Sequence, residues 1–118
     1  MDIEKFEKTE TQLSGFFEEV STLSKKKPDD AINKFKLKFI NMVIEDANNL
    51  LVSDYKPFQE FNKFDEDDIP SNSDVVFILS QYLNCLEILR RDNIGQMSGS
   101  WYWRVNGELT NKRTKRPL

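Results

Sequence analysis

The residue types on which most compact active sites depend are missing from this sequence. It contains no histidine and a single cysteine, Cys85. Without histidine there is no ordinary general base near neutral pH, which excludes Ser-His-Asp and Cys-His catalysis and histidine-ligated zinc. A lone cysteine excludes an internal disulfide and a thiolate zinc cluster, and it fits a reducing compartment. Gly95, Gly99 and Gly107 match neither the GxGxxG pattern nor the spacing of a P-loop.

Carboxylates are the remaining candidates for metal or acid–base chemistry. If the acidic run at residues 65–68 began a calcium loop, the sixth position would be Pro70 in place of glycine and the twelfth Val76 in place of glutamate. The run is therefore interpreted as a solvated loop. Glu45 and Asp46 show no paired spacing that would indicate a catalytic pair. We predict a protein that is not an enzyme and that holds no metal or cofactor.

Aromatic residues, by contrast, are abundant: nine Phe, three Tyr and two Trp make up 12% of the chain. The set at residues 55–64 exceeds what one small bundle is expected to bury, and exposed aromatic surface indicates a partner. Tryptophan, tyrosine and arginine are also enriched at interface hot spots. We predict a surface for another protein that is formed by Tyr55, Phe58, Phe61, Trp101, Trp103 and Arg104. Alternatively, the two tryptophans close the open end of the helical bundle.

Charge is distributed unevenly along the chain. Residues 1–100 carry 12 basic and 19 acidic residues, a net charge of -7, whereas residues 101–118 carry five basic residues and one acidic residue, a net charge of +4. Such a basic end beside aromatic residues can contact phosphates and stack on bases. The candidate nucleic-acid-binding residues are Arg104, Lys112, Arg113, Lys115 and Arg116. The alternatives are a solvated tail or a tail that folds back on the acidic run at residues 65–68.

These observations favour a small, non-enzymatic protein-binding module, such as an inhibitor, an immunity-type partner, a chaperone or an adaptor. The alternative is a small nucleic-acid-associated regulator that uses the basic C-terminal hairpin and tail. The two functions differ in their response to salt, because phosphate contacts weaken steeply with ionic strength and aromatic contacts do not. A homodimer fits either function, with the second or the last helix pairing across a two-fold axis.

The chain length of 118 residues is that of one domain. No apolar run approaches the roughly 20 residues of a membrane-spanning helix, and the acidic start, Met1-Asp2-Ile3-Glu4, does not resemble a secretory signal. We therefore expect no membrane partner and a cytoplasmic location.

Hydrophobic periodicity predicts a mainly α fold: a small bundle of three long helices and a short aromatic helix, followed by a β-hairpin. The long helices are expected at residues 4–24, 28–52 and 74–92, the second beginning at Pro28 and two aspartates. The second helix is apolar over more than half of its circumference, which places it either at the centre of the bundle or in an intermolecular contact. Steps of three from Tyr55 to Phe64 predict the short aromatic helix or a 3₁₀ turn.

The last helix carries a heptad seam, and residues 71–74 resemble a capping box at its start. Gly95 is expected to end this helix in a left-handed cap, and residues 96–99 to act as a hinge. Asn106-Gly107 between alternating residues predicts a hairpin over residues 100–111, with residues 112–118 fraying. The chain would thus consist of a helical part (residues 1–95) and a hairpin with a basic tail (residues 96–118) within one domain.

Overall fold

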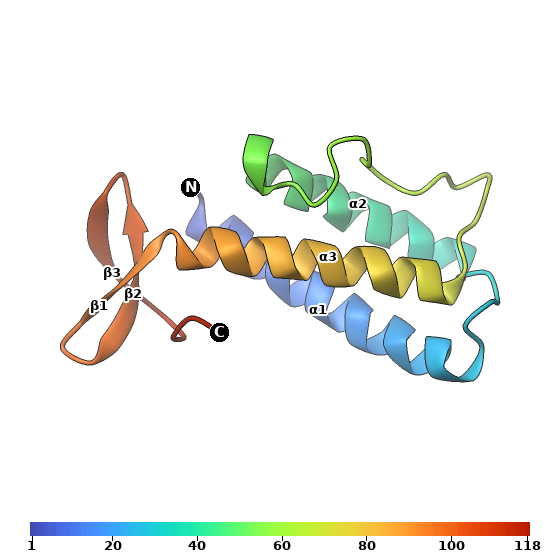
Figure 1. Ribbon diagram of the computed structural model, residues 1–118, viewed down its shortest axis with the longest axis horizontal. Helices are drawn as coiled ribbons and strands as arrows, with labels where there is room; N and C mark the ends of the chain where they lie inside the picture. The colour runs from blue at the N-terminus through green and yellow to red at the C-terminus, as the bar shows by residue number, and fades with distance from the viewer.

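The computed structural model describes the backbone of residues 1–118 and the side chains of residues 1–52 and 54–118. Three helices lie side by side, and a small antiparallel sheet follows the third at one end of a molecule that measures 48 × 27 × 20 Å (Figure 1). The elements are α1 (Ile3–Lys26), α2 (Lys34–Leu50), the 3₁₀ helix η1 (Ser53–Tyr55), α3 (Asn72–Arg91), β1 (Ile94–Met97), β2 (Ser100–Val105) and β3 (Glu108–Thr114). The predicted mainly α class and the C-terminal hairpin are confirmed.

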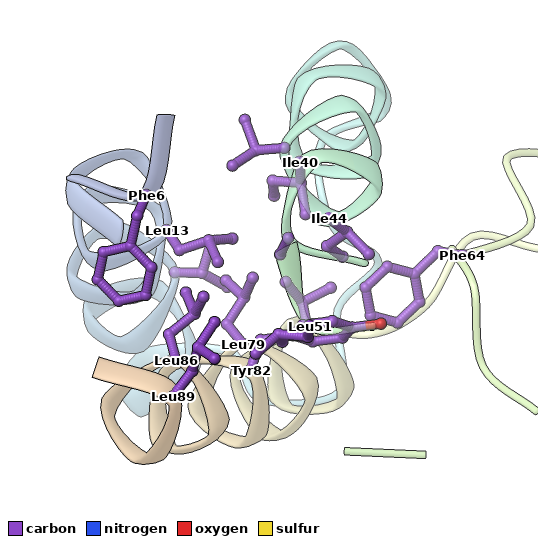
Figure 2. Packing of buried hydrophobic residues seen from close by; sticks show 14 of the residues in the cluster. Phe6, Leu13, Ile40, Ile44, Leu51, Phe64, Leu79, Tyr82, Leu86 and Leu89 are labelled. Atoms are coloured by element: carbon purple, nitrogen blue, oxygen red, sulfur yellow. The ribbon is translucent and has the colours of Figure 1, made fainter. Parts of the chain in front are cut away.

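The first helix, α1, begins one residue before and ends two residues after the predicted range of 4–24. Asp2 caps it by accepting a hydrogen bond from the amide of Lys5 at 3.1 Å. Phe6, Leu13 and Val20 are buried on the face that packs against α3 and α2. Figure 2 shows Phe6 and Leu13 directed toward the core residues of α3.

The second helix, α2, begins at Lys34, six residues after the predicted start at Pro28. Its cap is Asn33, whose side chain accepts a hydrogen bond from the amide of Lys36 at 3.0 Å. The segment before it pairs with the start of α3 instead of turning helical. The carbonyls of Pro28 and Asp30 accept hydrogen bonds from Ser73 and Asn72, at 3.0 and 2.9 Å. This long-range pairing outweighs the local helix-start signal.

No aromatic helix forms between α2 and α3, and this part of the prediction is wrong beyond the single turn of η1. The linker is instead held by asparagine side chains of α2. Asn41 forms two hydrogen bonds with the backbone of Phe64, donating to its carbonyl and accepting from its amide, both at 2.9 Å. Asn48 donates to the carbonyl of Asn62 at 2.9 Å. These side chains satisfy peptide groups that a helix would otherwise pair within itself.

The third helix, α3, confirms both the cap and the seam. The hydroxyl of Ser71 accepts a hydrogen bond from the amide of Asp74 at 3.2 Å. The seam residues Val75, Leu79, Tyr82, Leu86 and Leu89 are all buried, and Figure 2 shows Leu86 and Leu89 on the side of Phe6 and Leu13 of α1. The helix ends at Asp92 in an ordinary right-handed conformation, so Gly95 is not its cap.

The sheet has three strands in the order β1-β2-β3, one strand more than the sequence predicts. Residues 96–99 are therefore not a hinge but the end of β1 and a turn. In both turns the central residues have positive φ, 52° and 82° at Ser98-Gly99 and 51° and 80° at Asn106-Gly107, which is the geometry of two-residue hairpin loops. β1 is only four residues long and lacks an alternating pattern, which explains why periodicity missed it.

Trp103 of β2 packs the sheet against the helices. Its ring meets that of Phe6 edge to face, with centroids 4.9 Å apart and an interplanar angle of 69°. Ile94, which is opposite Trp103 in the β1–β2 register, is buried with it. The sheet thus shares one core with the bundle. Among the described residues, no helix is both long and apolar enough to cross a membrane.

Candidate functional site

The largest group of exposed apolar side chains on a single described helix lies on α2. Phe35, Phe39 and Met42 are 72%, 39% and 55% exposed, and their spacing of four and three residues places them on one face. We call this set the α2 surface. The rings of Phe35 and Phe39 touch edge to face, with centroids 5.0 Å apart. Exposed apolar side chains grouped in this way typically mark a place where another molecule binds.

The α2 surface continues into a hollow between α1 and α2. Its volume is about 480 Å³, and Phe16 of α1 lies on its far side, opposite Phe39 and Met42. Two ion pairs join the helices at the ends of the hollow. Lys36 contacts Glu19 at 2.7 Å and Lys5 contacts Asp46 at 3.1 Å, and all four side chains are partly exposed. Such exposed pairs add little stability, and the buried core side chains of α1 and α2 hold the two walls together.

The charges of α2 change sign along the helix. Lys34, Lys36 and Lys38 lie in its first half, and Glu45 and Asp46 in its second half. Lys36 and Asp46 are paired with α1, as described above. Lys38 and Glu45 are exposed, and neither has an ion partner among the described side chains. They are seven residues apart, so both lie on the same side of the α2 surface.

The sequence predicted partner-binding residues in the linker, and these residues differ in exposure and in their contacts. Phe58 is exposed and stacks on the exposed Phe77 of α3, with centroids 6.1 Å apart. Phe61 is half-buried between Phe64 and Tyr82. The hydroxyl of Tyr55 donates to a carboxylate oxygen of Asp92 at 2.7 Å. This hydrogen bond raises the pKa of Tyr55 and anchors η1 to the end of α3.

The two tryptophans do not form an exposed pair. Trp103 is 1% exposed, so its ring has no surface left for a partner, and it closes the end of the bundle as the alternative interpretation held. Trp101 is half-buried against the same core. Because successive residues of a strand point to opposite faces, Tyr102 and the exposed Arg104 lie on the outer face of the sheet.

The basic residues of the C-terminal region are dispersed, and only two of them share the outer face of the sheet. Arg113 is paired with Tyr102 across β2 and β3 and donates to the hydroxyl of Ser100 at 2.5 Å. Arg104 crosses over Gly95, on the other side of Tyr102, where a Cβ atom would collide with its guanidinium group. Lys112 is directed to the bundle, 3.8 Å from Glu4 of α1.

The tail does not fray, which corrects the sequence prediction. Its anchor is Arg90, a guanidinium that is 1% exposed. Arg90 donates to the carbonyls of Lys115 and Arg116, at 2.6 and 3.1 Å, and to the hydroxyl of Thr114 at 3.0 Å. The amide of Leu118 donates to Glu87 at 3.1 Å. These hydrogen bonds come from α3, toward the other end of the molecule from the acidic run at residues 65–68 (Figure 1).

Two carboxyl groups near this anchor have opposite pKa shifts. Burial raises the pKa of Glu10 on α1, and this effect exceeds the lowering by Lys115 and Arg90. Burial also acts to raise the pKa of Glu87, but hydrogen bonds from Arg90 and from the amide of Leu118 outweigh it and leave the pKa lowered. Neither carboxyl belongs to a group of metal-ligating side chains, and none was found among the described residues.

The sequence indicated an intermolecular contact as one of two roles for the second helix, but it did not separate the exposed Phe35 and Phe39 from buried residues of the same helix such as Leu37. The signal for an outward-facing set was the excess of apolar residues around α2, since one helix cannot bury its whole circumference in a three-helix bundle. The chain matches no protein-family model, no curated protein and no solved structure.

Proposed function

We propose that this protein acts by binding another protein chain, as a non-enzymatic inhibitor, immunity-type partner, chaperone or adaptor, and that the α2 surface makes the contact. The observation that carries the proposal is the outward exposure of Phe35, Phe39 and Met42 on one face of a helix. Exposing three large apolar side chains to water is unfavourable, and the hollow beside them can accommodate apolar side chains of a partner.

The geometry around the α2 surface supports the same function. Phe16 extends the apolar area onto α1, and the core residues that α1 and α2 share keep the two helices packed together. A preorganised surface loses less conformational freedom on binding than a flexible one. The Phe58–Phe77 stack is a second, smaller apolar area on α3 and the linker.

The experiment is a tagged capture from native lysate, split into nuclease-treated and untreated halves, followed by titration of the identified partner. The double variant F35S/F39S is compared with L23S/I88S, a double change at exposed apolar residues of α1 and α3 outside the α2 surface. We expect a stoichiometric, nuclease-resistant partner whose affinity falls at least about a hundredfold with F35S/F39S, since anchors of this kind are worth about 2 kcal/mol or more each. Equal affinity of F35S/F39S and wild type would contradict the proposal.

A second candidate function is the binding of single-stranded nucleic acid by the outer face of the sheet. The observation that favours it is the position of Tyr102 between Arg104 and Arg113. Such a face offers one ring for stacking and two guanidinium groups for phosphates. The acidic net charge of residues 1–100 counts against it. Binding of a mixed-sequence oligonucleotide that weakens steeply with added salt and is lost in R104A/R113A would support it.

A further inference from the structure

Lys38 and Glu45 place opposite charges symmetrically about the middle of helix α2, at the Met42 end of the α2 surface. The midpoint between them lies at Asn41–Met42, and Phe39 and Met42 are the exposed apolar side chains of α2 nearest to it. Both charged side chains are exposed, lie on the same side of the apolar residues, and lack an ion partner among the described residues. A helix surface with this pattern can be complementary to itself.

The complementarity depends on the direction in which a second helix runs. When two identical helices pair antiparallel about a two-fold axis, residues equally far from the axis meet, and each flank meets the same flank of the copy. With the axis at the midpoint, Lys38 would therefore meet Glu45 of the second copy, and Glu45 would meet its Lys38. In a parallel pair this flank would face the opposite flank of the copy, so neither reciprocal Lys38–Glu45 contact could form.

We propose that the α2 surface binds a second copy of this chain in an antiparallel, two-fold dimer with two reciprocal Lys38–Glu45 ion pairs beside Phe39 and Met42. The inference rests on the proposed function of the α2 surface and names its partner. The apolar side chains supply the contact area, and the charges select the antiparallel direction. Phe35 of each chain then lies toward an outer end of the helix pair, beyond the charged residues.

The test is sedimentation equilibrium of the purified full chain and of charge-exchange variants. K38E places two acidic residues opposite each other at both contacts, and E45K places two basic residues there. We expect a wild-type dimer and, for each single variant, a dissociation constant at least about tenfold higher, because two pairs change from attraction to repulsion. The double variant K38E/E45K restores both pairs and returns the constant toward wild type.

An equimolar mixture of K38E and E45K chains gives the sharpest result. In a heterodimer of these two chains both contacts again join opposite charges, so the mixture is expected to associate more tightly than either variant alone. K63E serves as the control, since it makes the same charge change on an exposed linker residue outside the α2 surface. Circular dichroism checks that each variant remains helical.

Two results would overturn the dimer: a wild-type chain that stays monomeric at the highest attainable concentration, or a dimer that K38E and E45K leave unchanged. Failure of the proposed function is distinguished by the capture experiment. If the wild type is monomeric but F35S/F39S loses a captured partner, the function stands and the dimer is refuted. If the single variants weaken the dimer and the mixture restores it, the dimer is established whether or not another partner is captured.

Discussion

The guanidinium group of Arg90 donates two hydrogen bonds to the carboxylate of Glu87, one turn earlier on α3, at 2.9 and 2.8 Å. The same group holds the backbone of the C-terminal tail through the carbonyls of Lys115 and Arg116. One buried cation therefore has a carboxylate on its own helix and a distant segment of chain as its partners. Charges buried in this way are tolerated only when they are paired and hydrogen-bonded.

Replacing Arg90 by methionine is expected to release the tail and to destabilise the fold. The change leaves Glu87 without its main partner and the tail carbonyls without donors, so the free energy of unfolding should fall by about 3 kcal/mol. Chemical denaturation measures the fall, and hydrogen exchange should show lost protection at residues 115–118. R91M, at the exposed neighbouring position, should change stability by less than about 0.5 kcal/mol. Equal effects of the two variants would refute the anchor.

The opposite pKa shifts of Glu10 and Glu87 predict opposite pH responses for their glutamine variants. The lowered pKa of Glu87 gives stability that is present above its unfolded pKa and is lost as the pH falls through its folded pKa. The raised pKa of Glu10 gives stability that is present below its unfolded pKa and is lost as the pH rises through its folded pKa. As the pH rises from 4 to 7, the free energy of unfolding of E87Q should fall relative to that of wild type. The free energy of unfolding of E10Q should rise relative to wild type over the same range.

Denaturation of wild type, E10Q and E87Q across this pH range measures both responses in one series. The unfolded chain serves as the common reference, because both carboxyls titrate there near the ordinary glutamate pKa of about 4.3. Differences of the same sign in the two variants would show that the assigned causes, burial for Glu10 and hydrogen bonding for Glu87, are wrong.

Asn41 is expected to be the residue on which the order of the linker depends. Replacement by alanine removes both of its hydrogen bonds to Phe64 and leaves that backbone amide and carbonyl buried without partners. The expected cost is about 1 to 3 kcal/mol in the free energy of unfolding. The rate of proteolysis within residues 56–70 should also rise in the N41A variant. Asn49, exposed on the same helix, provides the control: N49A should leave both the stability and the cleavage rate near those of wild type.

The same substitution should have opposite effects at Gly15 and Gly107. A Cβ atom would meet nothing within 4 Å at either position, so the difference lies in the backbone. Gly15 is within α1, where alanine is favoured by about 1 kcal/mol, and G15A should raise the melting temperature. Gly107 has a φ of 80°, which alanine adopts at a cost of roughly 1 to 2 kcal/mol, so G107A should lower it. A rise for both variants would contradict the turn geometry.

How far the sequence predicts the structure depends on whether the signal is local. The seam from Val75 to Leu89 and the Asn106-Gly107 turn are short-range patterns, and both are confirmed. The start of α2 and the form of the linker depend on partners far along the chain, such as the pairing of Asp30 with Asn72 and of Asn41 with Phe64. A single sequence does not reveal such pairs.

The candidate surface follows the same division. Periodicity identifies Phe35 and Phe39 as apolar positions on one helix, but it does not say which side of the helix the other two helices cover. Trp103 is the opposite case. Its residue type indicates an interface with a partner, but its contact is Phe6 of α1 in the same chain. The sequence supplies the apolar excess, and only tertiary packing decides which part of it stays exposed.

The packing of β2 against the core places the intrinsic fluorescence of the protein at the contact between the sheet and the helices. Trp101 and Trp103 are the only tryptophans in the chain, and both contact the core from β2. Intrinsic fluorescence therefore reports the attachment of the sheet to α1, whereas far-ultraviolet circular dichroism is dominated by the three helices. The two signals, recorded in a single unlabelled sample, compare the melting of these two parts of the fold directly.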